Sequence, residues 1–147
     1  MTSTGTPPKA THAFPRVKTW IRSIVVWLLI IIAESIHGTL RQLYLAPLIG
    51  DFRARRISVF TGIALIFVMA FLTIRWLRAH DTGTLVRIGA LWATLTMLFE
   101  ASLGRALGYD WSRIFEDYDL SKGGLMGLGL LAMLFTPLVA TRLRAVR

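Results

Sequence analysis

Apolar residues along this chain gather into four long runs, separated by shorter polar segments. The runs cover about residues 22–45, 57–77, 85–104 and 123–141. A helix rises about 1.5 Å per residue and needs about 20 apolar residues to cross the hydrocarbon core of a bilayer. Buried helices of a soluble core are the alternative, but little other sequence remains to bury them. We therefore predict an all-α, integral membrane four-helix bundle.

The polar segment before the first run has a different character. Residues 1–15 contain Ser, Thr, Gly and three prolines without apolar periodicity, and we expect a disordered cytoplasmic arm there. Residues 16–147 then form a single transmembrane domain. The first run has the basic flank of a signal peptide in Lys18 and Arg22, but a helix containing Glu34 continues where a cleavage site should stand. This pattern favours a retained first span.

Composition agrees with a membrane protein of 147 residues, with 54% hydrophobic and 17% charged residues. The net charge of +9 alone would suit a nucleic-acid partner, but the basic residues are not interleaved with stacking aromatics on any soluble element, so we expect none. Cysteine is absent, and no nucleotide-binding, zinc-protease or hydrolase motif occurs. We expect no cofactor and no metal, and the sequence leans away from an enzyme.

The distribution of charge predicts an orientation. Four spans place both termini on one side, and ten of the 17 Lys and Arg residues fall there with a single acid, Asp81. The opposite side carries seven basic and seven acidic residues. Basic residues favour the cytoplasmic side. We expect a multi-pass protein of the bacterial inner (plasma) membrane, with cytoplasmic N- and C-termini and a basic rim that meets anionic headgroups.

The two halves of the chain show a weak self-similarity. In each half a glutamate is followed by a glycine four residues on, then an arginine, then an aspartate-aromatic pair: Glu34, Gly38, Arg41, Asp51 and Phe52 against Glu100, Gly104, Arg105, Asp110 and Trp111. This order predicts two similar helical hairpins repeated about an axis along the membrane normal. Chance resemblance between Leu- and Arg-rich membrane sequences is the alternative.

Ionisable residues within the spans are the main candidates for function. A charged group at the centre of a bilayer costs about 2.5–3.5 kcal/mol, so Glu34 and Glu100 should face the bundle interior. Glu34, His37 and Arg41 have i, i+3, i+7 spacing and share one helix face. Glu100 shares a less polar face with small residues. If the hairpins pack as a pseudo-two-fold pair, Glu34 meets Arg105 while Glu100 meets Arg41.

Two interpretations of these charges stay open. The first is an ion- or proton-coupled transporter or channel-like protein that uses Glu34 and Glu100 with His37 and Arg41, since carboxyl and imidazole groups form proton relays. The second is a non-catalytic accessory or assembly subunit of a larger membrane complex, in which Glu–Arg pairs hold helices together. Metal or haem ligation by His37 would need a histidine from another subunit.

The stretch from Ala33 to Arg41, AESIHGTLR, resembles the first helix of the small multidrug resistance transporters, in which Ala-Glu precedes small residues, Thr and a basic residue. The resemblance covers about nine residues of this chain. It implies that Glu34 is the shared proton and cation site of a dimer. This chain is longer, its loops are larger, and Glu100 has no counterpart in that pattern.

Three further segments carry expectations. Trp111, Ile114, Phe115 and Tyr118 recur at i, i+3, i+4 and i+7, which predicts a short extracytoplasmic amphipathic helix at the membrane interface or a cap over the bundle. The basic loop 50–56 would bind headgroups, or its arginines would serve the acids of the other loop. Gly123 and Gly127 form a G-x-x-x-G pair for helix packing. The small size predicts a homo-oligomer or a place in a larger complex.

Overall fold

The computed structural model of the chain describes residues 17–119, 121 and 124–145, so the predicted arm lies outside the described residues. Within them the chain is helical and has no strand. The helices are α1 Val17–Leu40, the π-helical turn η1 Arg41–Leu45, α2 Ala46–Ile49, α3 Asp51–Leu77, α4 Thr82–Ala106, α5 Trp111–Glu116 and α6 Met126–Ala145. Four helical stretches are long and apolar enough to cross a membrane, as predicted.

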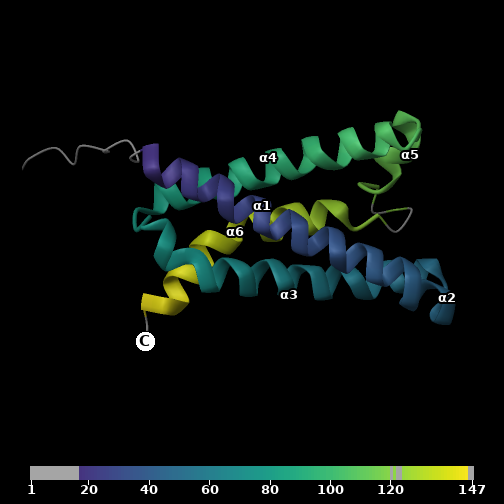
Figure 1. Cartoon of the computed structure of the whole chain (residues 1–147), viewed down its shortest axis with the longest axis horizontal. Coiled ribbons are helices and arrows are strands. Elements are labelled where there is room, and N and C mark those ends of the chain that lie inside the picture. The colour runs from purple at the N-terminus through teal and green to yellow at the C-terminus, as the bar shows by residue number, and fades with distance from the viewer. Residues whose placement is uncertain (1–16, 120, 122–123, 146–147) are drawn as a thin grey trace, which may run out of the picture.

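The four long helices run side by side along the length of the molecule (Figure 1). The start of α1, the connection from α3 to α4 and the end of α6 lie at one end, here called the terminal end; α2 and α5 lie at the other, the distal end. Helix α1 packs on α3, α4 packs on α6, and α3 packs on α6. Helices α1 and α4 approach each other towards the terminal end and diverge towards the distal end (Figure 1).

Helices α2 and α3 meet without the loop predicted at residues 50–56, and this prediction was wrong. Only Gly50 separates the two helices, with a φ of 86°, a conformation that glycine adopts without strain. Helix α3 then starts at Asp51, whose carboxylate binds Arg55 one turn later at 2.7 Å. The apolar run predicted a start at residue 57 because hydropathy does not register this polar first part of the helix.

The π-helical turn Arg41–Leu45 has a local cause in Pro47. In a regular α-helix the proline ring would clash with the carbonyl of Leu43, four residues earlier. The wider turn relieves this crowding, and the N–H of Ala46 donates to the carbonyl of Arg41 five residues back. The first predicted span therefore continues as one helical rod to Ile49, beyond its expected end at residue 45.

A core of buried, mostly apolar side chains fills the terminal half of the bundle. Its largest fully buried side chain is Trp92 on α4, whose indole N–H donates to the backbone carbonyl and the hydroxyl of Ser23 on α1 at 2.9 and 3.0 Å. Nearer the middle, Trp27 donates to the hydroxyl of Thr96, which in turn contacts the sulfur of Met133 on α6. These contacts hold α1, α4 and α6 together where α1 and α4 are close.

Helices α4 and α6 approach each other closely at Gly89. A Cβ atom placed there would overlap the backbone carbonyl of Leu134 on α6. The sequence predicted packing at Gly123 and Gly127 instead. Gly123 lies outside the described residues, and a Cβ at Gly127 would meet nothing within 4 Å. A packing role for Gly127 therefore needs a second chain and stays a prediction.

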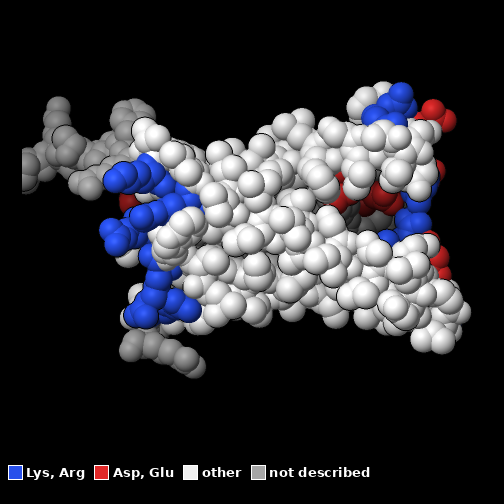
Figure 2. Space-filling view, viewed as in Figure 1, with Lys and Arg blue, Asp and Glu red and all other residues white. Residues whose placement is uncertain are grey.

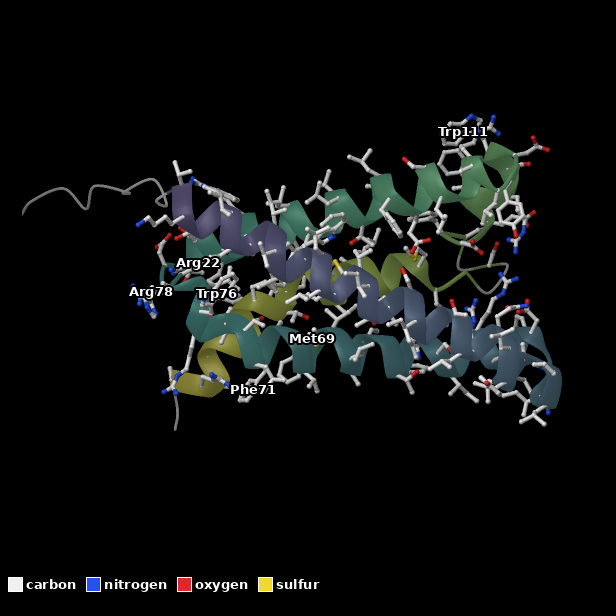
Figure 3. The ribbon with its side chains drawn as sticks, in the orientation of Figure 1. Arg22, Met69, Phe71, Trp76, Arg78 and Trp111 are labelled. Carbon is white, nitrogen blue, oxygen red and sulfur yellow. The ribbon has the colours of Figure 1, made fainter. Side chains whose placement is uncertain are left out.

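Basic side chains collect at the terminal end of the molecule (Figure 2). There the guanidinium of Arg22 donates to the carbonyl of Trp76 at 3.0 Å and lies 5.4 Å from the centre of its ring (Figure 3). Arg144 on α6 similarly lies 4.4 Å from the ring centre of Phe71. Aromatic side chains thus hold part of the predicted basic rim in place.

Candidate functional site

The divergence of α1 and α4 leaves a polar hollow in the distal half of the bundle (Figure 2). Part of it is a cavity of about 130 Å³ between α4, α5 and the start of α6. Its wall contains five polar side chains, Glu100, Tyr109, Arg113, Asp117 and Tyr118, among apolar ones such as Leu103 and Met126. Glu34 and Arg41 lie within electrostatic range of Glu100. We call the space lined by Glu100, Asp117 and Tyr118, with Glu34 and Arg41 within electrostatic range, the distal hollow.

Glu34 belongs to α1, and its carboxylate lies against Gly62 on α3. Its Oε2 is 3.5 Å from Nδ1 of His37, and its Oε1 is buried without a hydrogen-bond partner. His37 Nε2 lies 2.9 Å from the hydroxyl of Thr61 on α3. Since that hydroxyl can donate its proton to the carbonyl of Ser58, its oxygen is free to accept from His37 Nε2–H. Nδ1 of His37 then faces the Glu34 carboxylate.

Gly62 makes room for the Glu34 carboxylate, because a Cβ at this position would lie 3.0 Å from Oε2. We expect Gly62→Leu to lower the free energy of unfolding by about 1–3 kcal/mol through overpacking. Thermal unfolding in mild detergent would measure this, with Ala64→Leu on the exposed face of α3 as the control. Adding Glu34→Ala to Gly62→Leu should restore much of the lost free energy of unfolding. If the effects of the two substitutions simply add in the double variant, Gly62 and Glu34 are not in contact.

Arg41 and Tyr118 belong to opposite hairpins, and both lie within electrostatic range of Glu100. Nε of Arg41 and the hydroxyl of Tyr118 are both buried without a hydrogen-bond partner. Burial first, and then the carboxylates of Glu100 and Asp117, raise the pKa of Tyr118, so its hydroxyl keeps its proton and can act as a donor. The expected partners Arg41 and Glu100 thus lie within electrostatic range of each other without forming an ion pair.

Arg105 does not belong to this site, and its expected pairing with Glu34 was wrong. Its guanidinium donates to the carbonyl of Tyr109 at 2.8 Å and lies 5.5 Å from the ring centre of Trp111. The reason is its place in the last turn of α4, directly after Gly104. Basic side chains there reach the unpaired carbonyls beyond the helix end.

The four residues predicted to share an interfacial face divide between three environments. Trp111 and Phe115 are exposed and stack on each other with ring centres 6.2 Å apart. Ile114 is buried against α4, where a Cβ at Gly104 would lie 3.0 Å from its Cγ1. Tyr118 follows the six-residue α5 and borders the hollow. In this arrangement α5 covers part of the distal hollow.

An ion-pair network crosses the distal end of the hollow. Arg55 on α3 binds Asp51 of its own helix and reaches Asp117 beyond α5, with a 3.2 Å contact between Nη1 and Oδ1. Arg113 contacts the same Asp117 oxygen at 3.3 Å. The expectation that arginines of the first distal segment serve acids of the second is confirmed for Arg55, although this arginine lies on a helix.

Comparison of the chain with known protein families, characterised proteins and solved structures gives no match. Among the residues that the structure describes, no group of three or more His, Asp or Glu side chains is arranged to hold a metal ion. Interpretation of the site therefore depends on the chemistry of the carboxyl, imidazole, guanidinium and phenol groups around the distal hollow.

Proposed function

We propose that this chain is a small transport or channel-like protein of the bacterial inner membrane that moves protons or another small cation, with Glu34 and Glu100 as its ionisable sites. One observation carries the proposal. Carboxyl groups from α1 and α4, 66 positions apart in the sequence, come within electrostatic range of each other beside one hollow. Acidic side chains within membrane spans generally mark ion pathways or proton relays.

Each carboxyl group has a neighbour suited to proton transfer. Glu34 has His37, whose two ring nitrogens face the Glu34 carboxylate and the hydroxyl of Thr61. Glu100 has the hydroxyl of Tyr118 close by and Arg41 as a fixed positive charge. The apolar core around Trp27 and Thr96 lies between this site and the terminal end. A transported ion would therefore need that core to open transiently.

The proposal includes an orientation and an assembly. The termini would be cytoplasmic, with the basic terminal end against anionic headgroups and α5 on the extracytoplasmic side. The α1–α3 and α4–α6 hairpins would be two similar units. A homo-oligomer, or a place in a larger membrane complex, would cover the lateral side of the hollow that Figure 2 shows between α1 and α4.

Substitution of the two carboxyl groups tests the proposal. In proteoliposomes containing a pH-sensitive dye, we expect Glu34→Gln and Glu100→Gln to lose proton-linked flux by at least about tenfold, because an amide cannot bind and release the proton. The matched control is Glu116→Gln, since this acid belongs to α5 and pairs with Arg113. Flux equal to wild type in both hollow variants, with normal assembly, would overturn the transport proposal.

The second candidate function is an accessory or assembly subunit. The hydrogen bond between His37 and Thr61 favours it, because this contact ties α1 to α3 within the membrane. Under this alternative Glu34→Gln and Glu100→Gln disrupt folding or association, which size-exclusion chromatography in mild detergent would detect. Loss of flux with unchanged assembly would reject it.

A further inference from the structure

We propose that the Arg55–Asp117 ion pair is a gate that controls the entry of water and ions into the distal hollow from the distal end. The ion pair joins α3 to the segment after α5, and therefore joins the two hairpins. Together with Arg113 it lies beside the cavity that Glu100 lines. The identity of the ion that passes this gate rests on the proposed function. The gate itself is tested by measuring how easily water-soluble molecules enter the hollow.

The two hairpins are held together differently at their two ends. Towards the terminal end they share the buried contact of Trp92 with Ser23 and, nearer the middle, the half-buried contact of Trp27 with Thr96. Towards the distal end α1 and α4 have separated, and the Arg55–Asp117 pair bridges the hairpins there (Figure 1). The two tryptophan contacts can therefore act as a pivot, and breaking the distal ion pair would let the hairpins separate further.

Each partner of the ion pair is positioned by its own hairpin. Arg55 is held by Asp51 one turn earlier, with 2.7 Å between Nη2 and Oδ2. Asp117 is held by Arg113, and its backbone carbonyl accepts a hydrogen bond from the N–H of Met126 at 3.0 Å. Both groups therefore keep their places when the pair separates, and the pair can form again without refolding either hairpin.

The ion pair is accessible enough to be reversible. The side chains of Arg55 and Asp117 are 39% and 51% exposed, and exposed ion pairs are weak and weaken further with salt. A gate of this strength opens readily by thermal motion. Opening of this gate must also depend on ionic strength. A fixed structural contact would show no such dependence.

Thiol accessibility tests the gate directly, because the chain has no cysteine of its own. Met126 lines the cavity, so a Met126→Cys protein in lipid nanodiscs can be labelled with a membrane-impermeant thiol reagent. We expect Arg55→Gln in this background to raise the labelling rate about three- to fivefold at low salt. Salt of about 0.5 M should raise the rate with Arg55 intact and leave the Arg55→Gln rate unchanged.

Matched variants separate gating from general loosening. Asp117→Asn should raise the labelling rate like Arg55→Gln, and the double variant should show no further increase. Arg53→Gln removes an exposed arginine two residues from Arg55 and should have no effect. A cysteine at exposed His80, in an otherwise wild-type background, should react at the same rate with and without Arg55→Gln. A low-salt Met126→Cys rate that Arg55→Gln leaves unchanged, or additive effects of Arg55→Gln and Asp117→Asn, would overturn the gate.

The labelling result and the flux result can fail independently. If Arg55→Gln changes access while Glu34→Gln and Glu100→Gln keep full flux, the gate stands and the proposed transport sites fail. If Arg55→Gln leaves access unchanged while the glutamine variants lose flux, the transport sites stand and the gate is rejected.

Discussion

Gly89→Ala is expected to destabilise the bundle by about 3 kcal/mol, at the upper end of the range for overpacking substitutions. The new methyl group would overlap the backbone carbonyl of Leu134, and a backbone atom cannot move aside as a flexible side chain can. Helices α4 and α6 would have to separate along their contact. Helix association in membranes depends on such close packing, so a small separation is costly. Unfolding in mixed detergent micelles would measure the change.

Gly127→Ala provides the matched control for this prediction. A methyl group there meets nothing within 4 Å, and replacing glycine by alanine in a helix contributes up to about 1 kcal/mol. We therefore expect Gly127→Ala to leave the free energy of unfolding of the single chain unchanged or raised. If it instead weakens an oligomer, the G-x-x-x-G pair packs between subunits. Equal stabilities of the two alanine variants would contradict the close contact at Gly89.

Much of the fold follows from apolar runs, because transfer of a helix into lipid depends on summed hydrophobicity. The sequence therefore predicts four spans, but it misplaces the ends where polar residues continue a helix. Asp51 and Arg55 extend α3 beyond the apolar run by pairing one turn apart. The close contact at Gly89 also went unpredicted, since a single glycine in a span gives no sign of which neighbour it approaches.

The candidate site was predictable where one helix determines the geometry. Glu34 and His37 lie three positions apart on α1 and contact each other, as helix periodicity requires. The direction of Arg105 depends on where α4 ends, and the bond between His37 and Thr61 depends on how α1 packs against α3. Such features depend on tertiary structure, and the Arg55–Asp117 contact was anticipated only as a general pairing of distal arginines with distal acids.

Trp92→Ala is expected to cost about 3–5 kcal/mol in stability, because Trp92 is a fully buried, large side chain and its loss leaves a cavity. The indole also donates to the carbonyl and the hydroxyl of Ser23 across the α1–α4 contact. Trp92→Phe keeps most of the ring volume and removes this donor, so we expect a smaller loss of about 1–3 kcal/mol. Reversible unfolding in mild detergent would rank the two variants.

The same substitution bears on the proposed transport, because Trp92 lies in the apolar core between the distal hollow and the terminal end. If that core is the barrier to ions, a cavity at Trp92 large enough to hold water should raise the passive proton leak of proteoliposomes. Trp92→Phe should leak much less, since its ring still fills most of the space. A Trp92→Ala protein that is destabilised yet as proton-tight as wild type would place the barrier nearer Trp27 and Thr96, where Thr96 joins α1 to α6.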